Sequence, residues 1–144
     1  MNLPALTKNK VLVPVTDLTK EFVTQLELVD RDISQAQLLQ LNYSWRFIIA
    51  YNALAGLARL VIMLQGYKST GMYGNSVSID LMVHFASSKL SLPKKEFLIK
   101  IRKRRNELAY KRNVEVSDEE LAFLLDLVLR LYDEILDRCQ PPNN

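Results

Sequence analysis

The chain has 144 residues, the size of a single domain, and 49% of them are hydrophobic while 24% are charged. With only four glycines and five prolines, this composition excludes a disordered chain and argues against a turn-rich β fold. The formal net charge is +3. The single cysteine, Cys139, cannot form a disulfide within the chain, and the first residues lack the pattern of a secretory signal, so we expect a cytoplasmic protein.

One helical domain is expected across residues 1–144, with residues 1–15 as an N-terminal extension and residues 139–144 as a tail. The first helix opens at Thr16 or Asp17, both suitable N-caps, and runs to about Gln40. Its apolar residues recur every three to four positions, as on one buried helix face: Leu18, Phe22, Leu26, Val29, Ile33 and Ala36.

The second expected helix, about residues 43–65, is apolar on most sides and follows a cap at Asn42 or Ser44. It is long enough to imitate a membrane span, but Asn52 and Arg59 interrupt it. An arginine near a bilayer centre costs about 2.5 to 3.5 kcal/mol on insertion scales. We therefore expect a buried helix at the centre of a bundle and no membrane association.

Three further elements follow a stop signal at Gly66. Residues 66–76, GYKSTGMYGNS, are typical of a loop, a short third helix ends near Leu90, and a fourth extends from about Pro93 to Arg112. Ser117 and Glu120 form a capping box before a fifth helix at about residues 118–138. Together these elements predict an all-α, up-and-down antiparallel bundle of four main helices plus one shorter helix.

The charge is strongly separated along the second half of the chain. Residues 93–113 hold nine basic and two acidic residues, a local sum of +7, whereas residues 114–144 hold eight acidic residues and two arginines, a local sum of −6. Two interpretations stay open for the basic helix. It is either a solvated face paired with the acidic helix, or a surface that attracts phosphates.

Position on the helix separates these basic residues from one another. At 100° per residue, Phe97, Ile101 and Leu108 form the expected buried stripe. Arg105 falls beside Leu98 at the edge of that stripe, where a guanidinium needs a carboxylate or a ligand phosphate as acceptor. The opposite side is expected to carry ordinary surface charges: Lys100, Lys103, Glu107 and Lys111.

Two motifs resemble those of a known family. The run WRFIIAYNALAGLARLVIMLQGY at residues 45–67 and the later RNELAY at residues 105–110 are similar, in order and spacing, to motifs of HEPN domains. These domains are helical bundles found in prokaryotic toxin and defence systems and beside minimal nucleotidyltransferases. The resemblance covers about 70 residues and implies a homodimer-forming bundle.

In many HEPN domains an Arg-x(4 to 6)-His motif makes a metal-independent ribonuclease site. The resemblance puts Arg105, or Arg104, at the arginine position and Asn106 at the polar residue after it, while Tyr110 stands at the histidine position. The loop that often contains Gly-His-His has the sequence of residues 74–76, Gly-Asn-Ser.

The tyrosine changes the expected chemistry. Metal-free RNA cleavage uses a proton-transfer group with a pKa near 7, and a tyrosine with a pKa near 10 is ionised in only about one molecule in a thousand at pH 7. Arg105 and Tyr110 are also about 140° apart on a regular helix, so a dimer or a bend is needed to bring them to one ligand. The catalytic candidates are Arg105 and Tyr110, and the nucleic-acid-binding candidates are Arg102, Arg104, Arg105, Asn106, Tyr110, Lys111 and Arg112.

Three functions remain as hypotheses. The first is a HEPN-like module that binds RNA or a nucleotide, within a toxin–antitoxin or defence system; the second is an active endoribonuclease toxin; the third is a protein-binding partner of a cognate nucleotidyltransferase. No cofactor and no metal site are expected, because Cys, His and carboxylates lack metal-ligand spacing. His84 is expected to be a packed or surface residue, and Tyr51 to pack inside the second helix.

Overall fold

The computed structural model of the protein describes residues 5–6, 11–70, 74–86, 88–111 and 114–138. Within them five helices and two short strands are present, so the predicted all-α bundle is confirmed. The elements are β1 (Leu12–Pro14), α2 (Leu18–Ala36), α3 (Tyr43–Leu64), β2 (Tyr67–Ser69), α4 (Gly74–Ala86), α5 (Lys95–Tyr110) and α6 (Asp118–Arg138).

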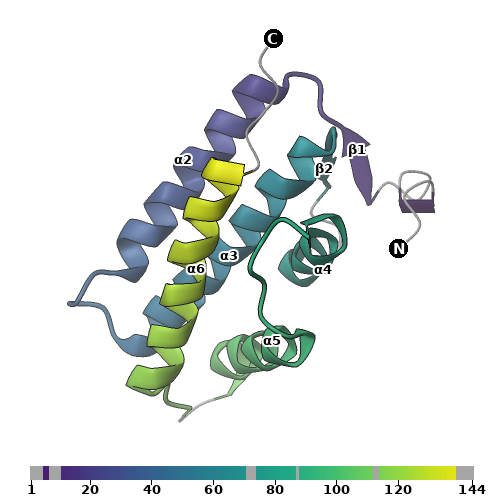
Figure 1. The fold of residues 1–144 in the computed structure, drawn as a ribbon. Coiled ribbons are helices and arrows are strands. Elements are labelled where there is room, and N and C mark those ends of the chain that lie inside the picture. Colours follow the sequence, from purple (N-terminus) through teal and green to yellow (C-terminus); the bar gives the residue numbers. More distant parts are fainter. Residues whose placement is uncertain (1–4, 7–10, 71–73, 87, 112–113, 139–144) are drawn as a thin grey trace.

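Helix α3 lies at the centre, and the other four helices pack against it. In Figure 1, α2, α3 and α6 lie side by side, whereas α4 and α5 are seen almost along their axes and so cross the other three. α2 and α3 are antiparallel, as expected for a short connection. α3 and α6 run in the same direction, because both begin at the end where Tyr43 donates a hydrogen bond to Asp118.

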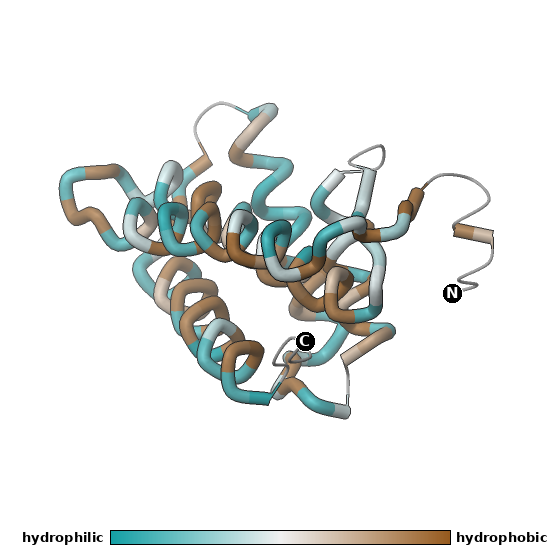
Figure 2. The backbone as a smooth tube through the Cα atoms, turned by 90° about the horizontal axis from the view of Figure 1, so that it is seen from above, coloured by the Kyte–Doolittle hydropathy of each residue, from teal (hydrophilic) through white to brown (hydrophobic). Residues whose placement is uncertain are grey.

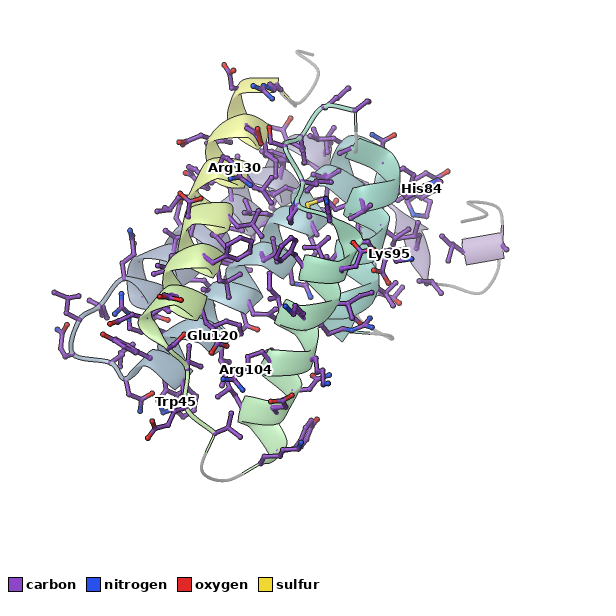
Figure 3. All side chains as sticks on the ribbon, turned by 60° about the horizontal axis from the view of Figure 1, so that its bottom comes forward. Trp45, His84, Lys95, Arg104, Glu120 and Arg130 are labelled. Carbon is purple, nitrogen blue, oxygen red and sulfur yellow. The ribbon has the colours of Figure 1, made fainter. Side chains whose placement is uncertain are left out.

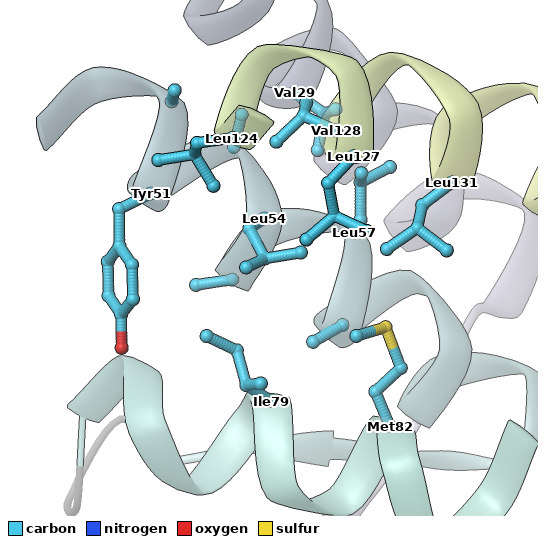
Figure 4. Packing of buried hydrophobic residues seen from close by; sticks show 14 of the residues in the cluster. Val29, Tyr51, Leu54, Leu57, Ile79, Met82, Leu124, Leu127, Val128 and Leu131 are labelled. Carbon is cyan, nitrogen blue, oxygen red and sulfur yellow. The ribbon is translucent and has the colours of Figure 1, made fainter. Parts of the chain in front are cut away.

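The apolar character of α3 is explained by burial. This helix is long and apolar enough to span a membrane, but 72% of its most apolar stretch is buried by the rest of the protein, as in a core helix. The surrounding helices alternate between hydrophobic and hydrophilic residues in Figure 2, as expected for elements with one buried face. Figure 4 shows the interior, where Leu54 and Leu57 of α3 pack with Leu127 of α6 and Met82 of α4.

The N-termini of α2, α3 and α6 are where the capping residues predict them, whereas α4 begins at Gly74, within the segment predicted to be a loop. The side chains of Asp17 and Asn42 each accept the backbone N–H three residues further on, at 3.1 and 2.9 Å. At α6, the Ser117 hydroxyl accepts the N–H of Glu120 at 3.1 Å, and the Glu120 carboxylate accepts the N–H of Ser117 at 3.4 Å. The predicted capping box is confirmed.

The two strands were not predicted from the sequence. β1 lies within the expected N-terminal extension and pairs antiparallel with β2, which lies within the expected loop. Leu12 of β1 is fully buried with Ile62 and Leu81, so part of the extension belongs to the packed fold. Gly66 ends α3 with φ of 92°, a conformation that glycine adopts without strain, and the chain then turns directly into β2.

Helices α2 and α3 approach each other most closely at Gly56. A Cβ atom added there would lie 2.8 Å from Cγ2 of Val29, a fully buried β-branched side chain that cannot easily move. The Gly56 carbonyl also accepts a hydrogen bond from Nε2 of Gln25 at 3.4 Å. The missing side chain therefore sets the distance between the two helices.

We expect Gly56→Val to lower the free energy of unfolding by about 1–3 kcal/mol, because the added atoms overpack the α2–α3 contact. Urea denaturation followed by circular dichroism measures this change. Ala122→Val, which places valine at an exposed position of α6, is the control and should cost only about 0.5 kcal/mol. Equal stability of the two variants would contradict the close contact.

A candidate anion-binding groove between helices α4 and α5

The connection before α5 is anchored on α6. The buried carboxylate of Glu134 accepts the N–H of Ser91 with both oxygens, at 3.2 and 3.1 Å. Arg130 donates to the carbonyl of Ser91 at 3.1 Å, and Arg138 donates to that of Lys89 at 3.3 Å. Burial acts to raise the pKa of Glu134, but the bonds from Ser91 and the nearby arginines lower it overall. The first end of α5 is thereby fixed.

Arg104 fixes the other half of α5. Its guanidinium makes a two-pronged contact with Glu120 of α6, from Nε to Oε2 at 2.6 Å and from Nη2 to Oε1 at 2.9 Å. It also donates to Glu107 at 3.1 Å and to the carbonyl of Glu115 at 2.8 Å. The hydrogen bond from Arg104 lowers the pKa of Glu120. Figure 3 shows the pair between α5 and the start of α6, so Arg104 holds the fold together.

The buried side of α5 differs from the expected one. Leu98 and Ile101 are buried, whereas Phe97, which the helical spacing places in the buried stripe, is 44% exposed. Glu107, expected to be an ordinary surface charge, is paired with Arg104. The reason is that α5 packs on α3 and borders α4 from one side, while the ring of Phe97 lies 5.6 Å from that of Phe123 of α6. This orientation turns Arg105 toward α4.

A hollow of about 300 Å³ lies between the start of α4 and α5, with Tyr51 of α3 beside it. We call it the basic hollow. Its lining residues are Tyr51, Gly74, Asn75, Ser76, Arg102, Arg105 and Asn106. It therefore joins the RNA-binding candidates Arg102, Arg105 and Asn106 with the loop residues 74–76 that the HEPN resemblance singles out.

Arg105 presents an unsatisfied donor here. Its Nε atom is buried and has no hydrogen-bond partner among the described residues. Burial raises the pKa of the Tyr51 hydroxyl, and the charges of Arg102 and Arg105 act in the opposite direction, which shows that both guanidiniums lie near that oxygen. A buried N–H without an acceptor is costly, so this position favours an anionic ligand.

The start of α4 is held in place by a polar network from α3. Asn75 accepts a hydrogen bond from Arg59 and donates one to Asn52 at 3.3 Å. Burial lowers the pKa of the Arg59 guanidinium. Asn52 and Arg59 of this network could be noticed in the sequence, because they are the two polar residues that interrupt an otherwise apolar stretch of the predicted helix. The network thereby holds the first residues of α4, and with them the positive end of the helix dipole, beside the basic hollow.

A second hollow of about 310 Å³ continues the first along the groove, since the two share Tyr51, Ser76 and Arg102. We call it the apolar hollow. Its other lining residues are Ile79, Asp80, Val83, His84, Lys95, Leu98 and Ile99. His84 is exposed at the rim, one of the two places expected for it, and Figure 3 labels it on α4 with Lys95 on α5.

The remaining candidates lie elsewhere. Tyr110, at the last position of α5, is 83% exposed and is absent from the lining of the groove. Lys111 is exposed directly after the helix, and Arg112 lies outside the described residues. Arg105 and Tyr110 therefore do not converge within one protomer, as their separation on the helix predicts. Across the described part of the chain no group of three His, Cys, Asp or Glu residues could hold a metal ion.

Comparison of the chain with protein-family models, with curated proteins and with solved structures finds no match. The resemblance to HEPN domains thus rests on the two sequence motifs, and residues of both motifs meet in the groove. These residues are Tyr51 from the first motif, and Arg105 and Asn106 from the second.

We expect Arg104→Ala to lower the free energy of unfolding by about 1–2 kcal/mol, because it removes a partly exposed, two-pronged ion pair between α5 and α6. This loss of unfolding free energy should be smaller in acid. The pKa of Glu120 is lowered in the folded protein, so the ion pair stabilises the fold above the ordinary carboxylate pKa, and its contribution is lost as the pH falls below that value. Thermal unfolding at pH 7 and pH 3 measures both effects. Lys103→Ala, at an exposed neighbour, should change little at either pH.

Proposed function

We propose that the protein is a HEPN-like module that binds RNA or a nucleotide by placing a phosphate in the basic hollow. One observation carries the proposal: Arg105, whose buried Nε has no partner among the described residues, lines a hollow together with Arg102 and the start of α4. Guanidinium groups and helix N-termini are both preferred phosphate partners. The side chains of Asn106 and Ser76 add polar groups to the same lining.

Arg104 is left out of the proposed ligand contacts. Its donors already serve Glu120, Glu107 and the carbonyl of Glu115. The basic segment therefore divides into a cation that stabilises the fold and cations that face the groove. Only the second group, Arg102 and Arg105, is expected to contact phosphate.

Binding without cleavage is the favoured activity. The described residues that line the basic hollow include no histidine and no carboxylate, its two arginines stay protonated, and Tyr110 is exposed at the end of α5. Several parts of the proposal follow from the HEPN resemblance alone: the homodimer, a role in a toxin–antitoxin or defence system and a cognate nucleotidyltransferase partner. The cytoplasmic location is inferred from the single cysteine and from the pattern of the first residues.

The test uses fluorescently labelled single-stranded RNA in a buffer with a metal chelator, with binding followed by anisotropy. We expect the protein to bind RNA and Arg105→Ala to weaken the affinity by about tenfold to a hundredfold, the usual effect of losing a hydrogen bond to a charged group. Lys103→Ala removes the same charge from an exposed position of the same helix and should cost less than about threefold.

Gel analysis of the same samples distinguishes the alternatives. Cleavage that Arg105→Ala and Tyr110→Phe both abolish would identify an active endoribonuclease and contradict the binding-only proposal. No retention of RNA by the folded protein would favour the protein-binding partner. Equal weakening by Arg105→Ala and Lys103→Ala would show that charge alone, and not the hollow, attracts the RNA.

A further inference from the structure

The two ends of the groove have different chemical character. The basic hollow gathers Arg102, Arg105 and the start of α4, whereas the apolar hollow has a lining of Ile79, Leu98 and other aliphatic side chains. The charged residues Asp80, Lys95 and Arg102 also line the apolar hollow, but a phosphate placed there would meet mainly aliphatic surfaces and the negative charge of Asp80. The apolar hollow therefore suits an uncharged group that is covalently attached to the phosphate.

The size and lining of the apolar hollow match a planar ring. Its volume of about 310 Å³ is at the lower end of the range for small-ligand pockets, which are mostly apolar with a few placed polar groups. Val83 of α4 and Ile99 of α5 contribute aliphatic surfaces, and Tyr51 lies where the two hollows join. A nucleobase has these properties: it is flat, largely apolar on its faces and polar at its edge.

We propose that the groove binds a single nucleotide unit, with its phosphate in the basic hollow and its base, preferentially guanine, in the apolar hollow. This inference rests on the proposed function, because the phosphate site at Arg105 anchors the base beside it. It goes further in naming a second binding site and the base that the site selects.

The preference for guanine follows from two side chains of opposite charge in the lining of the apolar hollow. An ionised carboxylate only accepts hydrogen bonds and can accept two at once, and an ammonium only donates. Guanine carries two neighbouring donors, N1–H and the 2-amino group, next to the acceptor O6. Asp80 of α4 and Lys95 of α5 supply the complementary pair. Adenine, cytosine and uracil each lack this row of two donors and one acceptor.

Among the described residues, no ion pair of Asp80 or Lys95 stabilises the fold. Within the described part of the chain, Asp80 and Lys95 form no ion pair with each other or with any other residue. Asp80 is exposed, and it lines the apolar hollow together with Tyr51. Both groups are therefore available to a ligand.

Isothermal titration calorimetry with six probes tests the inference: the 3′ and 5′ isomers of guanosine monophosphate, the same two isomers of adenosine monophosphate, ribose 5-phosphate and guanosine. We expect the better guanosine monophosphate to bind about tenfold or more tighter than ribose 5-phosphate and about fivefold or more tighter than the better adenosine monophosphate. Asp80→Asn should weaken the guanine nucleotide by about tenfold, leave ribose 5-phosphate unchanged and remove the preference over adenine.

The outcomes separate this inference from the proposed function. If guanosine monophosphate binds no tighter than ribose 5-phosphate while RNA still depends on Arg105, the phosphate site stands and the base site is wrong. If Asp80→Asn leaves the ratio between guanine and adenine nucleotides unchanged, the selection by Asp80 is wrong. If Arg105→Ala alters neither RNA nor nucleotide binding, both proposals fail. Circular dichroism of Asp80→Asn confirms that the exposed substitution leaves the fold intact.

Discussion

The burial of α3 along most of its length is the constraint on which the rest of the structure depends. A helix that is apolar on nearly every side must be covered from several directions, so α2, α6, α4 and α5 each take one part of its surface. Two of them, α4 and α5, cross α3 and leave a groove between them. Two polar residues of the central helix, Asn52 and Arg59, lie at this edge and hold the start of α4.

The charges of the second half of the chain serve two separate purposes. On one side of α5, Arg104 and the acidic residues around Glu120 are neutralised within the fold, and Glu134 with its arginines anchors the preceding connection. On the other side, Arg102 and Arg105 face α4. Because α5 is held near both ends, the guanidiniums are kept in position before any ligand arrives, which reduces the entropy lost on binding.

The helices could be predicted from the sequence because their signals are local. Caps such as Asp17 and Asn42, the stop at Gly66 and the capping box at Ser117 each act within one turn of chain, and all are observed. The strands could not be predicted, since three residues on each side carry no visible alternation and their pairing joins segments more than 50 positions apart. For the same reason, the sequence did not indicate that part of the expected N-terminal extension forms the strand β1.

The candidate site was only partly predictable, because adjacent residues on α5 have different neighbours. Arg104 and Arg105 are equivalent in composition and motif, yet one meets carboxylates of α6 and the other borders α4. Which of them faces the groove depends on the rotation of α5, and that rotation is set by the helices that cover Leu98 and Ile101. Helical spacing alone placed Phe97 in the core, since it holds no information on where the covering helices lie.

The position of Trp45 determines which structural change the intrinsic fluorescence of the protein follows. It is the only tryptophan of the chain, it is 58% exposed, and it lies in the first turn of α3, at the end where α6 also begins. Tyr51 follows six residues later, roughly 9 Å along the helix axis. Intrinsic emission should therefore follow the detachment of α6 during unfolding, while occupation of the groove leaves the spectrum nearly unchanged. Fluorescence and calorimetry would thus observe two different events in the same sample.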